Sequence, residues 1–202
     1  MNDVIIFGGS GFIGSHLIKH LNTNGVIPLV CDIIEKPLLK NLRYNFRCID
    51  VRKPFDIDLS DKNVSIIYNL AAISKSPGHE PQEYYETNIN GAKNISNFAE
   101  EKNINTIIFT STIAVYGYSE SPCLENSPLN ADSDYGLSKI QAEKEMAVAE
   151  SQAREKEAEA RIAEAQAMMA QAKAEIAKIE KEKLEAEAAI AESEAEAERA
   201  KA

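Results

Sequence analysis

The amino-acid sequence predicts a doubly wound α/β fold, with a five-stranded parallel sheet in the order 3-2-1-4-5, followed by one long C-terminal helix. Three observations predict it. Short apolar runs rich in β-branched residues alternate with segments of helical periodicity over residues 1–140. A glycine-rich stretch joins the first apolar run to the first helical segment. After Gly136 the 202-residue chain contains no glycine, proline or aromatic residue, as an uninterrupted helix requires.

The expected elements follow in order along the chain. Residues 3–8 (DVIIFG) form an apolar run that ends in glycine, which is typical of a buried parallel strand. Residues 12–24 have apolar side chains at helical spacing and end at Asn-Gly, a common stop signal for a helix. A further helix is expected at residues 81–102, and the other four strands at residues 26–32, 46–50, 64–71 and 106–112.

The C-terminal segment is dominated by strong helix formers. Residues 141–202 comprise 62 residues, of which 21 are alanine, 16 are glutamate and 10 are lysine or arginine. We therefore expect two parts, a folded domain at residues 1–145 and a long charged helix at residues 146–202. The net charge is -6 over residues 141–202 and -4 over residues 1–140. This acidity disfavours nucleic acids and anionic membrane surfaces as partners.

The long helix has a weak heptad pattern. Five of the eight a positions are large and apolar, whereas the d positions are nearly all small. Those a positions are Val148, Glu155, Ile162, Met169, Ile176, Lys183, Ile190 and Ala197. Such a seam suits a loose coiled coil with a partner and is too thin for a compact core. At 1.5 Å per residue the helix would be roughly 90 Å long, so we expect it to project into solvent or to bind a partner.

Composition also bears on the compartment. No apolar run reaches the length of a membrane span, and the N-terminus lacks the pattern of a secretory signal. The cysteines Cys31, Cys48 and Cys123 form an odd, widely spaced set, which favours buried free thiols and a reducing cytoplasm. His16 and His20 lie four residues apart without an evident third ligand, so we expect no metal.

The glycine-rich stretch predicts a phosphate-binding loop. Gly8, Gly11 and Gly14 lie three residues apart, between the first strand and the first helix. In this context the first glycine allows a tight turn, the second lets backbone approach a pyrophosphate, and the third lets helix and sheet pack closely. The helix N-terminus offers free N–H groups to the phosphates, so Phe12 and Ile13 also belong to this binding segment. An ordinary tight turn would explain one glycine but not three.

Two acidic residues follow later strands. Asp32 ends the second strand, 18 residues after Gly14. A carboxylate there accepts hydrogen bonds from ribose hydroxyls and repels a 2′-phosphate, which favours NAD over NADP. Asp50 ends the third strand before Val51 and either faces the adenine or lies in a surface turn.

Candidate catalytic residues come near the end of the domain. Tyr135 and Lys139 are four residues apart, so on a helix they share one face. An ammonium about 4 Å from a phenol contributes up to roughly 4 kcal/mol at an effective dielectric of 20. That coupling would lower the pKa of a tyrosine from about 10 towards 7, where it serves as a general acid or base. Thr112 lies at the end of the fifth predicted strand and completes the set.

Seven motifs in order resemble the extended short-chain dehydrogenase/reductases, in particular the NAD-dependent epimerase/dehydratase group that acts on nucleotide sugars. The motifs are FGGSGFIGSHL, Asp32, Asp50-Val51, NLAA at 69–72, NING at 88–91, TSTIAVYG at 110–117 and YGLSK at 135–139. The resemblance implies a Rossmann domain, and it implies that Leu70, Ala71 and Ala72 line the cofactor while Asn88 lies beside it. It also implies that Thr112 polarises the reacting oxygen, Tyr135 is the acid/base, and Lys139 holds the nicotinamide ribose.

The chain departs from the family after the YxxxK motif. Family members continue into a sixth strand and a C-terminal lobe that binds the nucleotide sugar, and here the long helix stands in that place. The resemblance therefore implies nearly complete cofactor residues and largely absent substrate residues. Three hypotheses follow: an impaired nucleotide-sugar epimerase or dehydratase, an NAD-binding remnant without turnover, and a structural protein that assembles through the helix. We also expect self-association through the helix or through the open edge of the fifth strand.

Overall fold

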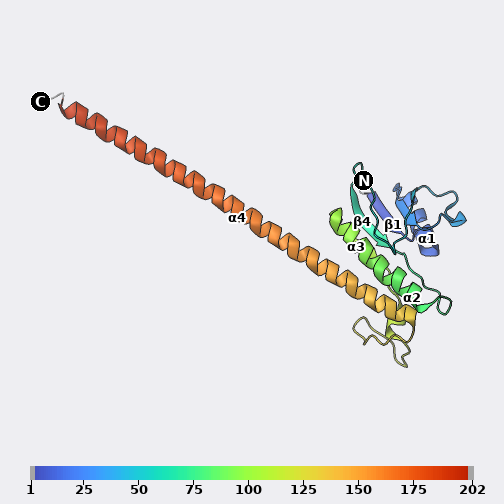
Figure 1. The fold of residues 1–202 in the computed structure, drawn as a ribbon. Helices are drawn as coiled ribbons and strands as arrows, with labels where there is room; N and C mark the ends of the chain where they lie inside the picture. Colours follow the sequence, from blue (N-terminus) through green and yellow to red (C-terminus); the bar gives the residue numbers. More distant parts are fainter. Residues whose placement is uncertain (1–2, 200–202) are drawn as a thin grey trace. The chain divides into compact units, whose positions relative to one another are not determined.

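The structure is a computed structural model that describes residues 3–199. The chain forms two compact units, and the boundary between them falls between Ser151 and Gln152. The first unit contains the sheet and its covering helices, and the second is helical (Figure 1).

The sheet of the first unit has five strands, and all of them are parallel. The observed order is β3-β2-β1-β4-β5, which confirms the predicted topology. The strands are β1 (Asp3–Phe7), β2 (Leu29–Asp32), β3 (Asn45–Cys48), β4 (Val64–Asn69) and β5 (Ile107–Phe109). The chain crosses from β1 outward to β3 on one side and then to β4 and β5 on the other, so the order reverses beside β1. Ligands of such sheets bind at the carboxyl ends of the strands at this reversal.

Several strands end earlier than their apolar runs predict. The assigned strand β5 stops where Phe109 is paired with Asn69, although Thr110 N–H still donates to Asn69 O at 3.3 Å. Likewise β3 ends at Cys48, so Asp50 lies in the turn beyond the strand. Thr112 and Asp50 therefore lie just past the carboxyl ends of their strands.

Both faces of the sheet are covered, because successive side chains of the central strands point to opposite faces. Ile5 and Phe7 of β1 join one hydrophobic cluster, to which α3 (Gly91–Glu101) contributes Ile95 and Phe98. The alternate residues of β1 join a second cluster with Ile18 of α1 (Phe12–Thr23). This two-sided burial explains why β1 is apolar at every position from Val4 to Phe7.

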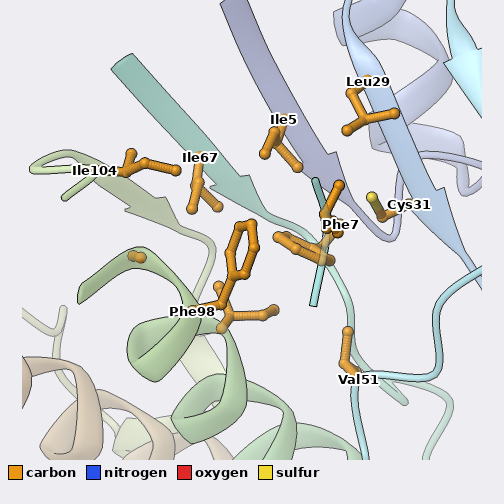
Figure 2. Close-up of a cluster of buried hydrophobic side chains, with 11 residues drawn as sticks. Ile5, Phe7, Leu29, Cys31, Val51, Ile67, Phe98 and Ile104 are labelled. Atoms are coloured by element: carbon orange, nitrogen blue, oxygen red, sulfur yellow. The ribbon is translucent and has the colours of Figure 1, made fainter. Parts of the chain in front are cut away.

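The first cluster is centred on aromatic rings. Figure 2 shows Phe7 and Phe98 close together, with Ile5 and Ile67 from neighbouring strands beside them. Phe55 completes the group, with ring centroids 5.2 Å from Phe7 and 5.3 Å from Phe98. Such aromatic contacts fix α3 against the sheet.

The helix predicted at residues 81–102 is divided into three parts. It begins as α2 (Pro81–Tyr84), continues as a π-helical segment, η2 (Tyr85–Asn90), and becomes α3 only at Gly91. A π-turn widens the helix locally and is frequent at functional sites. Here it contains the buried Asn88. The apolar spacing predicted the helical segment but not the change of helix type.

The last helix, α4, extends from Asp134 to Arg199. Its first part belongs to the compact unit, where Ala142 is fully buried and the Ser96 hydroxyl contacts Met146 Sδ at 3.7 Å. Beyond Gln152, every side chain that the structure describes is exposed. Within the described residues, no helix combines the length and apolar character that a membrane span needs.

The cysteines differ from expectation. Cys31 on β2 is a buried free thiol, and burial raises its pKa to about 12. Cys48 and Cys123 are free but exposed, so the expectation of burial was wrong for these two. Cys48 lies on β3, an edge strand with little cover, and Cys123 lies in the long loop before α4.

Candidate functional site

The loop between β1 and α1 is shaped by two glycines that tolerate no side chain. Gly8 has a φ of 75°, and a Cβ there would lie 2.6 Å from the Ala71 nitrogen. A Cβ on Gly14 would lie 2.4 Å from the Gly9 carbonyl oxygen. Gly11 differs, because its Cβ would meet Gly8 O at 3.2 Å and nothing closer. Gly8 and Gly14 therefore serve packing, whereas Gly11 leaves the loop surface open to a ligand.

The N-terminus of α1 suits an anion. Its N-cap residue, Gly11, provides no side-chain cap, and the first turn contains no acidic residue. The first N–H groups of a helix lack intrahelical partners and carry a partial positive charge. The Ser10 hydroxyl is fully buried in this loop and has no hydrogen-bond partner within the described chain. Uncapped N–H groups and an orphaned hydroxyl fit a pyrophosphate.

Asp32 lies directly beside this loop. The Ser10 N–H donates to Asp32 Oδ2 at 3.0 Å, and the Ile33 N–H donates to Oδ1 at 2.8 Å. Each carboxylate oxygen retains further acceptor capacity. The side chain is therefore fixed against the loop, with acceptors that remain available for ribose hydroxyls.

Large apolar side chains flank the Ser10–Asp32 contact. Phe12 is 73% exposed, and Ile33 is 60% exposed. Ile13 and Ile34 are also exposed. Together with the glycine loop and Asp32, this apolar surface fits a ligand that combines a flat base, a ribose and a pyrophosphate.

Asp50 and Val51 have different environments. The Asp50 carboxylate accepts hydrogen bonds from Nε and Nη2 of Arg52, at 2.8 Å and 2.7 Å. The guanidinium lowers the pKa of this carboxyl. Val51 is buried in the first hydrophobic cluster, and its carbonyl accepts a hydrogen bond from Asn94 Nδ2 at 2.8 Å. The Val51 side chain therefore belongs to the core, whereas Asp50 sits in a turn with a fixed orientation.

Leu70, Ala71 and Ala72 follow β4 at its carboxyl end. The Leu70 N–H donates to Phe7 O at 2.9 Å, and the Ala71 N–H donates to Asn69 Oδ1 at 3.2 Å. Ala71 backbone also lies against Gly8. These residues form the wall beside the glycine loop, at the reversal of strand order.

Asn88 links this wall to α4. Its Oδ1 accepts the Ile73 N–H at 2.9 Å, and its Nδ2 donates to Ile73 O at 3.1 Å and to Ser138 Oγ at 2.8 Å. The Ser138 hydroxyl in turn donates to Tyr135 O at 2.8 Å. The amide is 2% exposed, so these bonds form a buried network that fixes the helix bearing Tyr135.

Thr112 caps a short 3₁₀ helix, η3 (Ile113–Tyr116). Its Oγ1 accepts the Ala114 N–H at 3.2 Å, which leaves the hydroxyl proton able to bind a substrate oxygen. The cap fixes the hydroxyl at the carboxyl end of β5.

Tyr135 and Lys139 both lie in the first turns of α4. The Tyr135 ring lies 6.4 Å from the ring of Tyr84. Lys139 is 1% exposed, and its Nζ donates to Thr110 O at 2.6 Å and lies 3.9 Å from the Phe109 ring centroid. Burial lowers the pKa of this ammonium to about 8, and the charge of Glu143 opposes the shift. The ammonium thus contacts the end of β5, and its predicted coupling to the Tyr135 phenol stays a prediction.

The structure also reveals supporting residues that sequence reasoning missed. Ser138 bridges Asn88 and Tyr135, and the Ser111 hydroxyl donates to the Glu143 carboxylate on α4. Arg52 orients Asp50. Among these supporting residues, only Glu143 could have been found from the sequence, because it lies four residues after Lys139 on the same helix face.

Most of the predicted residues thus fall into two groups at the carboxyl edge of the sheet, whereas Asp50 lies in its own turn and Val51 lies in the core. The glycine loop, Asp32 and the wall at 70–72 form the first. The second comprises Asn88, Thr112, Tyr135 and Lys139. The wall connects the two groups through the hydrogen bonds between Ile73 and Asn88.

Comparison with known proteins gives a consistent result. The model of the NAD dependent epimerase/dehydratase family matches residues 4–162. UDP-glucose 4-epimerase of Lactobacillus helveticus is 30% identical over 154 residues, which cover 73% of this chain and 47% of the relative.

Solved structures agree in fold. UDP-glucuronic acid 4-epimerase from Bacillus cereus in complex with NAD is 26% identical with a TM-score of 0.63, covering 73% of this chain and 52% of that protein. An NAD-dependent NDP-hexosamine 5,6-dehydratase involved in tunicamycin biosynthesis is 28% identical with a TM-score of 0.64, covering 73% and 50%. The chain spans about half the length of the curated relatives it matches.

Proposed function

The chain belongs to the NAD-dependent epimerase/dehydratase family, and from this premise we propose that residues 3–151 bind NAD and serve oxidation and reduction at a carbon of a nucleotide sugar. The observation that carries the proposal is the hydrogen bond from the Ser10 N–H to Asp32 Oδ2 at 3.0 Å. It holds a ribose acceptor beside a loop whose free N–H groups suit phosphates.

Cofactor binding would engage the first group of residues. The uncapped N-terminus of α1, with Gly11, Phe12 and Ile13, would hold the pyrophosphate. Asp32 would accept hydrogen bonds from the adenosine ribose, and its negative charge would repel the 2′-phosphate of NADP. Asp50 would face the adenine while Arg52 fixes its carboxylate. Leu70, Ala71 and Ala72 would line the cofactor, with Val51 supporting them from the core.

When bound, NAD would accept a hydride from a sugar carbon and return one. The chain's own residues would handle the proton and the geometry. The Tyr135 phenol would exchange a proton with the reacting sugar oxygen, and the Thr112 hydroxyl would donate a hydrogen bond to that oxygen. Lys139 would donate to the nicotinamide ribose and favour the phenolate of Tyr135 by its charge. Asn88 would keep these residues aligned through Ser138.

The substrate class follows from the relatives. Solved proteins similar to this chain include one bound to UDP-glucose and NAD, at 27% identity and a TM-score of 0.60. We therefore propose a nucleotide-linked sugar as the substrate. Because the chain spans about half the length of its relatives, a second candidate is NAD binding without turnover. A third role, assembly through α4, is favoured by the exposed side chains described beyond Gln152.

Calorimetric titration of the full chain with NAD and NADP tests the proposal. We expect saturable binding of NAD and much weaker binding of NADP. Absence of NAD binding would refute the proposed function. Incubation with UDP-glucose in the presence of saturating NAD then separates the candidates, because formation of a different nucleotide sugar selects an enzyme, whereas the returned hydride leaves no net NADH.

The free cysteines support a reducing compartment. Cys48 and Cys123 are exposed thiols without a disulfide. Exposed unpaired thiols are rare in oxidising compartments. We infer a cytoplasmic location on this ground.

A further inference from the structure

In one segment of the helical unit, acidic and basic residues are placed so that they would face each other if two copies of the segment paired in antiparallel orientation. In the heptad with Val148 at position a, Glu159 and Lys173 occupy e positions, and Arg161 and Glu175 occupy g positions. All four side chains are exposed. These positions flank the apolar seam, where they decide the orientation and register of a coiled coil.

We propose that α4 binds a second copy of this chain in antiparallel orientation, with the two-fold axis beside Gln166 and Met168. In antiparallel pairs e positions face e positions of the partner, and g positions face g positions. With this axis Glu159 of each chain faces Lys173 of the other. Arg161 likewise faces Glu175 of the other chain. Two-fold symmetry produces each pair twice, so four oppositely charged contacts surround the centre of the interface.

The seam has the shape that this arrangement requires. In antiparallel coiled coils an a residue packs against a d residue of the partner. Met169 at a would pack against Ala165 at d, so that a large side chain meets a small one. Ile162 is 59% exposed and Met169 is 67% exposed. Pairing would remove this apolar surface from water.

The alternatives fit the charges less well. In a parallel in-register pair each g position faces the e position five residues later in the partner. Glu175 would then face Glu180, and Lys173 would face Met168. Arg154 facing Glu159 would be the one attractive pair among these contacts. An antiparallel slip by one heptad places Glu159 opposite Gln166 or Glu180, so the Glu159–Lys173 contact is lost.

Sedimentation of the full chain over a wide concentration range tests the proposal through charge reversal. Lys173→Glu should weaken dimerisation about tenfold, because two attractive contacts become two repulsive ones. The sequence places uncharged residues three and four positions from Lys173 on either side, so this change breaks no intrahelical ion pair. Glu159→Lys should weaken the dimer similarly. The double variant Glu159→Lys/Lys173→Glu should restore it, because each pair is then exchanged.

Lys178→Glu is the control for charge reversal away from the seam, and unlike Lys173 it lies three residues from Glu175 and four from Glu182 in its own helix. Lys178 occupies position c, away from the seam, and carries the same change of charge. It should leave dimerisation unchanged. In a parallel pair Lys173 faces Met168, so Lys173→Glu would leave dimerisation unchanged. The double variant would then dimerise no better than Glu159→Lys alone. That pattern would overturn the proposal. So would a dimer that both single variants leave intact, or a wild-type chain that stays monomeric at all concentrations. The result is independent of NAD, so the proposed binding of NAD and nucleotide sugars is tested separately, and only the candidate role in assembly through α4 depends on it.

Discussion

The ammonium of Lys139 donates a hydrogen bond to the carbonyl oxygen of Thr110 at 2.6 Å. The lysine is buried beneath the Phe109 ring, and its acceptor Thr110 lies two residues before Thr112 in the chain. This contact connects the helix that bears Tyr135 to the end of β5. It also places a positive charge where water is excluded, and this has a measurable consequence.

Lys139→Met should stabilise the compact unit at pH 7, and the gain should shrink as the pH rises. The pKa of Lys139 is lowered from 10.5 to about 8 in the fold. Below pH 8 the folded and unfolded chains both carry the charge, so its burial cost is fully present. Between pH 8 and 10.5 the folded chain holds fewer protons than the unfolded one, so wild-type stability rises relative to the variant. The shift corresponds to at most about 3 kcal/mol.

Urea unfolding at several pH values checks this prediction. All 7 tyrosines lie at or before Tyr135, so near-ultraviolet circular dichroism of tyrosine reports on the compact unit alone. Lys144→Met, at an exposed position five residues later, is the control for removal of a lysine from the same helix. A difference between wild type and Lys139→Met that is constant with pH would contradict the prediction.

Asp32→Ala should weaken NAD binding and narrow its advantage over NADP. The carboxylate accepts the Ser10 N–H and remains available to ribose hydroxyls. Loss of hydrogen bonds to a charged group corresponds to about 1.5–3 kcal/mol, or roughly 10- to 150-fold in affinity. Asp32→Asn is the matched variant, because it retains the shape and removes the charge that repels a 2′-phosphate. Equal calorimetric affinities of the wild-type chain for NAD and NADP would refute the assignment of Asp32.

Gly11→Ala and Gly14→Ala should separate binding from folding. A Cβ on Gly11 approaches Gly8 O at 3.2 Å, so the variant should fold nearly normally. The methyl group would obstruct a pyrophosphate, and NAD affinity should fall at least tenfold. A Cβ on Gly14 lies 2.4 Å from Gly9 O, so this variant should lose stability and binding together. Thermal unfolding followed at the tyrosine bands, with NAD titration, distinguishes the two outcomes.

Asn88→Ala should destabilise the compact unit by about 2–4 kcal/mol. It removes three hydrogen bonds and leaves groups of Ile73 and Ser138 without their partner. Asn94→Ala removes one hydrogen bond, to Val51 O, and should cost about 1 kcal/mol. Similar losses in urea unfolding for the two variants would show that the Asn88 network adds little.

Tyr135→Phe should abolish any turnover of nucleotide sugars and leave NAD affinity nearly unchanged. The phenol serves the proton transfer and contributes little to binding. Lys139→Ala should reduce both, because the ammonium would also hold the ribose. We expect slow turnover by this chain alone, since it spans about half the length of its relatives. Robust steady-state turnover by the wild-type chain, followed as UDP-galactose formed from UDP-glucose, would contradict that expectation.

The sequence by itself determined the parallel sheet, its strand order and the long helix. Buried parallel strands must be apolar on both faces, so runs such as residues 3–7 are visible without a structure. The tight geometry of the glycine-rich loop was also predictable, because Gly8 and Gly14 occupy positions where any Cβ would collide with backbone. Local sterics and periodicity are properties of the chain itself.

Only the tertiary structure decided how the site is supported. The hydrogen bonds from Asn88 to Ser138 and from Ser111 to Glu143 join residues that are far apart in sequence. The change to a π-helix at Tyr85–Asn90, which contains Asn88, was not predictable from the apolar spacing either. Cys48 is exposed because its strand lies at the edge of the sheet. The hydrogen-bonded ion pair of Arg52 and Asp50 depends on the turn that follows that strand. Hydrogen bonds between distant polar side chains leave no periodic trace in the sequence, because their geometry exists only once the sheet brings the strand ends together.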